Sequence, residues 1–112
     1  MKLLQITPRA GTRLYGAMVK KQAEIHRAGR GTFLLTGRKR AKAARWSHVR
    51  YKGAIDLAAG EADAVAAKIR SPEVGDETRL LSSFLGWLDR HFGDSVSSVN
   101  IQYEPSAARR RH

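Results

Sequence analysis

The chain has 112 residues, enough for about one domain, and it contains no cysteine, which excludes disulfide bonds and thiolate metal sites. It carries 21 Lys and Arg against 10 Asp and Glu, giving a formal net charge of +11. No stretch is apolar over the roughly 18 residues that a membrane helix needs, and the start lacks the long apolar run of a signal peptide, so a cytoplasmic protein is expected.

The charge is distributed unevenly along the chain. Residues 1–55 hold 14 Lys or Arg and one acid, whereas residues 56–112 hold 7 bases and 9 acids. A surplus segregated in this way indicates a polyanionic partner, most often nucleic acid. A solvated surface that keeps the protein soluble is the alternative interpretation.

The first third of the chain predicts a strand, a helix and a second apolar segment. Residues 2–6 have the pattern of a strand. Thr7 followed by Pro8 suits the start of a helix that would end at Gly29, but Gly11 and Gly16 weaken its first turns, so Thr12 is the alternative start. Residues 31–37, GTFLLTG, form a short apolar run between glycines that predicts either a strand or a loop packed on the core.

A basic stretch and two alternating segments follow. Residues 38–44, RKRAKAA, predict a loop because like charges crowd it. Residues 45–57 alternate between apolar and polar positions, and residues 63–70 alternate again, so the two segments predict a hairpin. Since successive strand side chains point to opposite faces, we expect Val49 and Tyr51 to face the core. The even residues would then lie on the open face: Trp46, His48, Arg50 and Lys52.

The last third predicts a helix, a strand and a tail. Asp76 or Thr78 can cap a helix with a broad apolar stripe that Gly93 ends. Residues 95–104 form a final strand, and residues 105–112 a basic, disordered tail. The expected fold is therefore a single α+β domain over residues 1–104, a small antiparallel sheet with two helices on one face. Its arrangement would be ferredoxin-like (βαββαβ), or a variant with an extra short strand.

The basic and aromatic hairpin is the strongest functional signal in the sequence. Single-stranded nucleic acids are bound by cationic grooves that follow the phosphates and by rings on which bases stack. Four-stranded α+β domains use such a sheet face to bind RNA. The residues expected to bind RNA or single-stranded DNA are Arg38, Lys39, Arg40, Lys42, Arg45, Trp46, His48, Arg50, Lys52, Lys68 and Arg70.

Catalysis has weaker support, so we predict a binding protein with no catalytic residue, metal or cofactor. The four histidines do not occur at metal-ligand spacing, and no serine sits in a nucleophile-elbow context. One alternative is a metal-independent ribonuclease of the toxin type, with His48 as its acid or base. Another is a non-enzymatic protein-interaction module of phage or mobile-element origin, whose open sheet face would bind a protein partner or a second copy of the chain.

Overall fold

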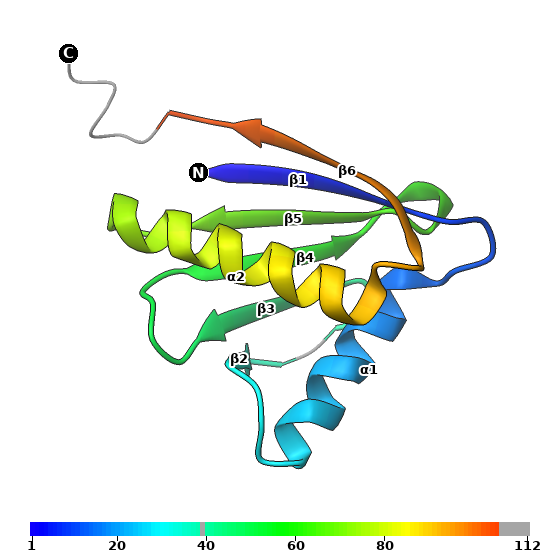
Figure 1. Cartoon of the computed structure of the whole chain (residues 1–112), viewed down its shortest axis with the longest axis horizontal. Coiled ribbons are helices and arrows are strands. Elements are labelled where there is room, and N and C mark those ends of the chain that lie inside the picture. Colours follow the sequence, from blue (N-terminus) through cyan, green and yellow to red (C-terminus); the bar gives the residue numbers. More distant parts are fainter. Residues whose placement is uncertain (39, 106–112) are drawn as a thin grey trace.

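The computed structural model describes residues 1–38 and 40–105, so Lys39 and the tail over residues 106–112 lie outside the described residues. Figure 1 shows a twisted sheet with two helices lying across it. The helices are α1 (Leu14–Arg27) and α2 (Val74–Phe92), and the strands are β1 (Lys2–Pro8), β2 (Phe33–Thr36), β3 (Ala43–His48), β4 (Ala54–Ala59), β5 (Val65–Arg70) and β6 (Val96–Tyr103).

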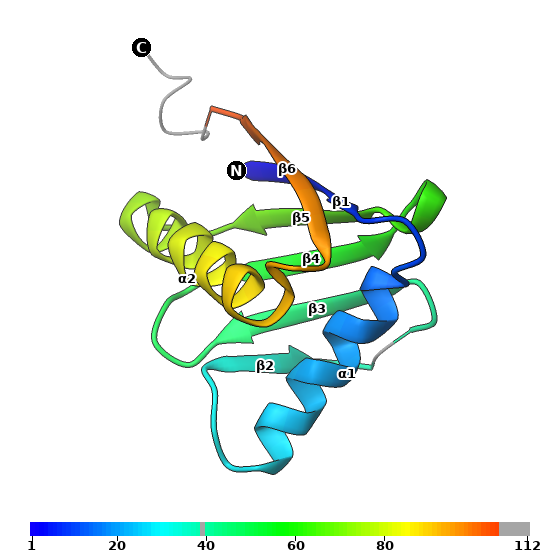
Figure 2. The same ribbon diagram turned by 45° about the vertical axis from the view of Figure 1, so that its right-hand side comes forward.

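The sheet has six strands in the order β2-β3-β4-β5-β1-β6, and every neighbouring pair is antiparallel. Both helices cover the same face, as Figures 1 and 2 show from two directions, and neither covers the other face, which we call the open face. The α+β class with two helices on an antiparallel sheet is thus confirmed. The ferredoxin-like arrangement is not confirmed, because the sheet has six strands and a different strand order.

The core lies between the helices and the covered face of the sheet. Trp46 of β3 is at its centre with 0% of its surface exposed. Its ring centroid lies 5.1 Å from that of Trp87, 6.3 Å from that of Phe84 and 5.8 Å from that of Phe33. Aromatic side chains bury large areas, so this cluster holds α2 and the β2–β3 hairpin against each other.

The prediction of one continuous strand over residues 45–57 is wrong. The chain forms β3, turns at residues 49–53 and returns as β4, with Trp46 opposite Ile55. Gly53 makes this turn possible, because its φ is +127° and a Cβ at that position would collide with the carbonyl oxygen of Arg70. Since the chain reverses, even residues of β3 and odd residues of β4 face the helices.

Other element boundaries differ from the expectations in smaller ways. Strand β1 continues through Thr7 to Pro8, so these two residues do not start α1, which begins at Leu14. Strand β2 confirms the apolar run before the basic loop as a strand. Helix α2 begins at Val74, so Asp76 lies in its first turn rather than capping it.

Candidate nucleic-acid interface

The open face of the sheet carries two cross-strand rows of side chains, which follow from the strand register. The first row is polar and charged apart from Leu3 and consists of Thr36, Arg45, Asp56, Lys68, Leu3 and Gln102. The second row is mostly small and consists of Ala43, Ala58, Ala66, Gln5 and Asn100. Cations and amides therefore stand beside a floor of alanines.

These two rows line a hollow of about 840 Å³ in the open face. The hollow exists in part because three neighbouring strands present alanine there. Gly37, Arg38 and Arg40, from the loop between β2 and β3, line its rim. We call this surface, together with Arg70 next to it, the open-face groove. Four cationic side chains and one carboxylate lie among its described lining residues: Arg38, Arg40, Arg45, Lys68 and Asp56.

Asp56 forms ion pairs with two arginines at the edge of the groove. Its two carboxylate oxygens accept hydrogen bonds from Nε of Arg45 at 2.6 Å and from Nε of Arg70 at 3.3 Å. Partial burial alone would raise the pKa of Asp56, but the hydrogen bonds and charges of the two arginines outweigh it and lower the pKa. Both arginine side chains are about half exposed, and their bonds to Asp56 use only Nε, so the terminal nitrogens are not needed for these bonds.

Hydrogen bonds hold the backbone of the loop between β2 and β3 from Arg40 to Ala43. The Tyr15 hydroxyl donates to the Arg40 carbonyl at 3.0 Å, and the Arg40 amide donates to the Ala43 carbonyl at 3.0 Å. The Lys42 carbonyl accepts from the Ala59 amide at 2.8 Å. The side chains of Arg38, Arg40 and Lys42 remain exposed. At Arg40 and Lys42 a held backbone with exposed cationic side chains presents charge with little ordering cost.

Trp46 does not belong to this surface, which corrects the expectation that it stacks on a base. Its ring is fully buried on the helix-covered face, and its Nε1 finds no hydrogen-bond partner among the described residues. By contrast, Val49, expected in the core, lies in the turn after β3 and is 54% exposed. Because the chain reverses at residues 49–53, Trp46 is buried and Val49 is exposed, the opposite of what the alternation predicted.

His48 also lies on the helix-covered side, away from the open-face groove. Its ring stacks on Tyr51 at 4.5 Å and meets Phe33 edge-on at 5.3 Å. Its Nδ1 accepts a hydrogen bond from the Arg50 amide at 3.0 Å. Burial, and then the nearby charge of Arg50, lower the pKa of His48, so the neutral ring is favoured. The geometry gives His48 a packing role and places it on the opposite side of the sheet from Arg45 and Lys68.

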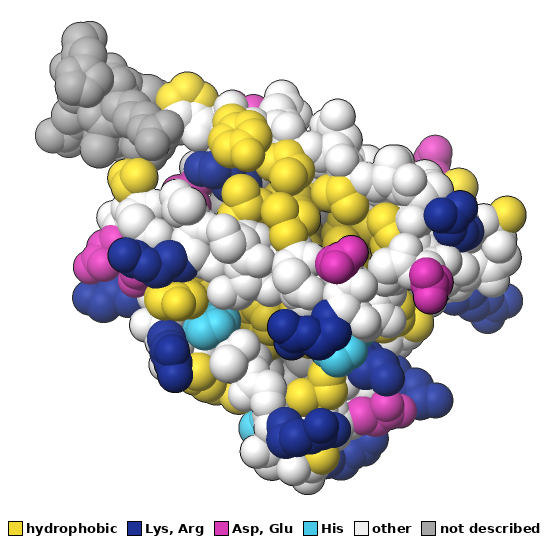
Figure 3. Space-filling model, viewed as in Figure 1, with side chains coloured by type: hydrophobic (Ala, Val, Ile, Leu, Met, Phe, Trp, Pro, Cys, Tyr) yellow, Lys and Arg dark blue, Asp and Glu magenta, His cyan; other side chains and the backbone are white. Residues whose placement is uncertain are grey.

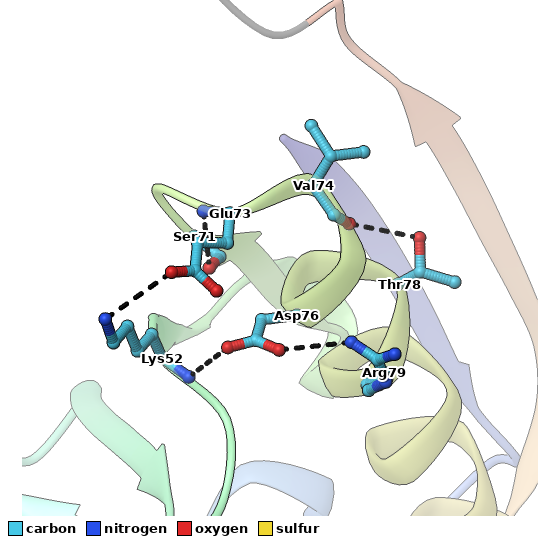
Figure 4. A network of polar contacts seen from close by, with 7 residues as sticks. All are labelled: Lys52, Ser71, Glu73, Val74, Asp76, Thr78 and Arg79. Carbon is cyan, nitrogen blue, oxygen red and sulfur yellow. Dashed lines mark hydrogen bonds and ion pairs between the residues drawn. The ribbon is translucent and has the colours of Figure 1, made fainter.

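Lys52 ties the turn after β3 to the start of α2 (Figure 4). Its amide donates to Asp76 at 2.9 Å, and its Nζ lies 3.4 Å from a Glu73 oxygen. Asp76 also accepts from Arg79 at 3.3 Å. The Lys52 ammonium is therefore partly neutralised by Glu73, the residue before α2, and Lys52 and Arg50 lie in the turn rather than in the groove.

The structure brings together five of the eleven predicted residues and adds three amides that the sequence did not reveal. The five are Arg38, Arg40, Arg45, Lys68 and Arg70, and the added residues are Gln5, Asn100 and Gln102. The amides come from β1 and β6, which no local pattern connects to the basic segment. Their even or odd position within each strand was the only signal that could have placed them on the open face.

The described part of the chain contains neither a cluster of metal ligands nor a helix that could span a membrane. Within residues 1–38 and 40–105, no three His, Asp or Glu side chains come together as metal ligands. Neither α1 nor α2 is long and apolar enough to cross a membrane.

Likeness to known proteins adds nothing to this geometry. No protein-family model, curated protein or solved structure matches this chain. Its function is therefore inferred from the site alone.

Proposed function

We propose that this protein binds nucleic acid, RNA or single-stranded DNA, in the open-face groove. The observation that carries the proposal is the concentration of cations around a single carboxylate on the sheet face that neither helix covers. Arg38, Arg40 and Lys68 form no ion pair within residues 1–38 and 40–105, so their charges are available to phosphates. Lys and Arg contacts to phosphates supply affinity without reading sequence.

The alanine floor and the amides give the groove a second feature that suits a polynucleotide. Small side chains allow a sugar or base to approach the sheet closely between the cations. Gln5, Asn100 and Gln102 then offer both donors and acceptors to base edges. No aromatic ring lines the groove among the described residues, so binding rests on phosphate contacts and amides instead of the stacking that the sequence suggested.

A concave surface favours a flexible single strand over a duplex. A single strand can bend so that successive phosphates meet Arg38 and Arg40 at the rim and Arg45 and Lys68 inside the groove. A rigid duplex presents a convex cylinder, which contacts a hollow chiefly at its rim. Competition between single strands and a duplex of the same sequence tests this part of the proposal.

The main test is a titration of a fluorescent single strand at several salt concentrations. If the four lining cations each neutralise one phosphate, log K should fall against log salt with a slope of about −2.8, the value for single strands at about −0.7 per contact. Between 50 and 200 mM salt, affinity should then fall by roughly 50-fold. Binding that does not change with salt would refute the proposal.

Matched charge variants distinguish the groove from a general charge effect. Lys68→Ala and Lys20→Ala each remove one positive charge, but Lys20 lies exposed on α1, on the other side of the sheet. We expect Lys68→Ala to weaken binding and reduce the slope by about 0.7, whereas Lys20→Ala leaves the slope unchanged. The Arg38→Ala, Arg40→Ala double variant should act in the same direction without loss of thermal stability. Equal effects of Lys20→Ala and Lys68→Ala would assign binding to net charge alone.

A further inference from the structure

The outer edge of β6 is long and uncharged. The strand occupies one end of the sheet, spans eight residues and has the sequence VSSVNIQY. It contains no Lys, Arg, Asp, Glu or Pro, the residues that proteins use to protect exposed edges from pairing. The opposite edge, β2, has only four residues and is followed by the basic loop. The two edges therefore differ in the protection that their sequences provide.

The backbone of β6 presents a defined set of free groups at this edge. Glu104 and Met1 exchange hydrogen bonds at 2.9 and 3.2 Å, and β6 pairs with β1 from Tyr103 back to Ser98 without a register shift. Hydrogen-bonded and non-bonded pairs alternate in an antiparallel ladder. Val99, Ile101 and Tyr103 therefore direct their amides and carbonyls outward, where no segment of residues 1–38 or 40–105 pairs with them.

Apolar side chains accompany this edge on the helix-covered side. Tyr103 is 65% exposed, and Val99 and Ile101 are half-buried. Figure 3 shows hydrophobic side chains gathered over the region between α2 and β6. A hollow of about 340 Å³ lies there, and its apolar lining includes Leu85 and Val96. A partner that pairs with β6 would cover part of this surface as well.

We propose that β6 pairs antiparallel with β6 of a second copy of this chain, about a twofold axis at Ile101. This register places all three outward-facing residues of each copy opposite those of the other, with each pair exchanging two backbone hydrogen bonds. Val99 faces Tyr103 of the second copy, an aromatic and β-branched pair of the kind that stabilises neighbouring strands. On the open face, Asn100 lies opposite Gln102 of the second copy, and two amides can hydrogen-bond to each other.

The charge distribution favours a second copy as the occupant. Residues 13–52 hold 12 of the 21 Lys and Arg, and those that the structure describes lie around α1, in the loop between β2 and β3, on β3 and in the turn after it, in the half of the sheet away from β6. With strands about 4.8 Å apart, β2 lies roughly 24 Å from β6, so the basic ends of the two copies would be about 50 Å apart. Such a separation is several times the Debye length of about 8 Å at physiological salt. Since β6 itself carries no charged side chain, two copies meet there with less repulsion than at the basic end of the sheet.

Single-cysteine cross-linking tests the register, because the chain has no cysteine of its own. Ile101→Cys would place two thiols at the axis, with Cα atoms about 5.5 Å apart, within the range of a disulfide. Leu35→Cys is the matched control, since Leu35 is 40% exposed at the other edge of the sheet. Under mild oxidation we expect most of the Ile101→Cys protein to migrate as a covalent dimer and most of the Leu35→Cys protein to remain monomeric.

A charge variant keeps the proposal testable if Ile101→Cys folds poorly. Asn100→Lys combined with Gln102→Lys changes two exposed side chains on the open face and sets like charges opposite each other across the proposed interface. Sedimentation should give twice the 12.4 kDa chain mass for the unmodified protein and a single chain mass for the double variant. A monomeric unmodified protein would overturn the proposal. A dimer would also overturn it if the double variant remained dimeric and the oxidised Ile101→Cys protein formed no covalent dimer. Neither result bears on the groove's ligand.

Discussion

Replacing Trp46 tests whether its ring serves the core or a ligand. Trp46→Ala removes a fully buried indole that packs on Phe33, Phe84 and Trp87. Core substitutions of this size cost about 3–5 kcal/mol, a large share of the roughly 5–15 kcal/mol that stabilises a typical domain. At about 4 °C per kcal/mol for a chain of this length, the melting temperature should fall by roughly 12–20 °C.

Trp46→Phe refines this test. The buried Nε1 of Trp46 has no partner among the described residues, and an unsatisfied buried donor costs about 1–3 kcal/mol. Phenylalanine removes that donor and keeps a ring in the cluster, so its loss of stability should be less than half that of alanine. Val49→Ala is the control, because Val49 is 54% exposed and its change should stay within about 0.5 kcal/mol. Thermal melting by circular dichroism measures all three variants. An unchanged melting temperature for Trp46→Ala, with weakened binding of a single strand, would refute the assignment of this ring to the core.

Three further predictions concern charge. Asp56→Asn frees Arg45 and Arg70 and should strengthen single-strand binding and steepen the salt slope, whereas Asp89→Asn, the same change outside the groove, should do neither; equal titration curves for both would contradict the groove. Burial and neighbouring cations lower the pKa of His48 and His91, so the unfolded chain takes up these protons first. The free energy of unfolding should therefore decrease as the pH falls below about 6.5, and His48→Phe with His91→Gln should flatten that decrease in urea titrations; an unchanged slope would argue against it. Glu77→Gln leaves the buried Lys2 ammonium, 2.7 Å from the carboxylate, without its partner and should cost about 3 kcal/mol or more. Lys2→Met with Glu77→Leu should recover most of that loss in thermal melts, and a failure to recover would show that the pair itself contributes net stability.

The elements with long, regular patterns could be predicted from the sequence. The stripe that includes Leu81, Phe84 and Leu88 recurs at helical spacing over many residues, and α2 follows it to Phe92. The alternation in residues 96–103 likewise corresponds to β6. In both cases one local periodicity fixes the element type and the buried face together.

The β3–β4 reversal could not be predicted from alternation. One continuous strand and two strands joined by a turn both show apolar and polar residues in alternation, because side chains alternate between faces within each strand. The five-residue turn contains no Asn-Gly or Asp-Gly pair, and Gly53 was the only local sign of it. Because this turn was not predicted, Trp46 was expected on the open face and Val49 in the core, whereas the structure buries Trp46 and exposes Val49.

Five of the cationic residues of the candidate site were expected from the sequence, but its amides were not. Lys68 and Arg70 lie on the open face, as the parity of β5 indicated, and Arg45 joins them from β3. The amides of β1 and β6 were missed because they reach the groove through strand pairing between opposite ends of the chain. Sequence separation, more than residue type, limits what can be predicted about such a face.

The groove and the β6 edge share residues, which couples the two proposals. Asn100 and Gln102 line the groove and also lie at the proposed twofold axis, so pairing of β6 would join two open faces into one continuous surface. A strand long enough to reach both grooves would then bind the second as an intramolecular event, at an effective concentration of about millimolar. Ile101→Cys offers the comparison, because its side chain lies on the opposite face from the groove. Oxidised protein should bind a long single strand more tightly than reduced protein diluted below its dimerisation range, while a short strand that fills one groove should bind both forms equally. Equal gains for both lengths would mean that cross-linking alters each groove and does not join them.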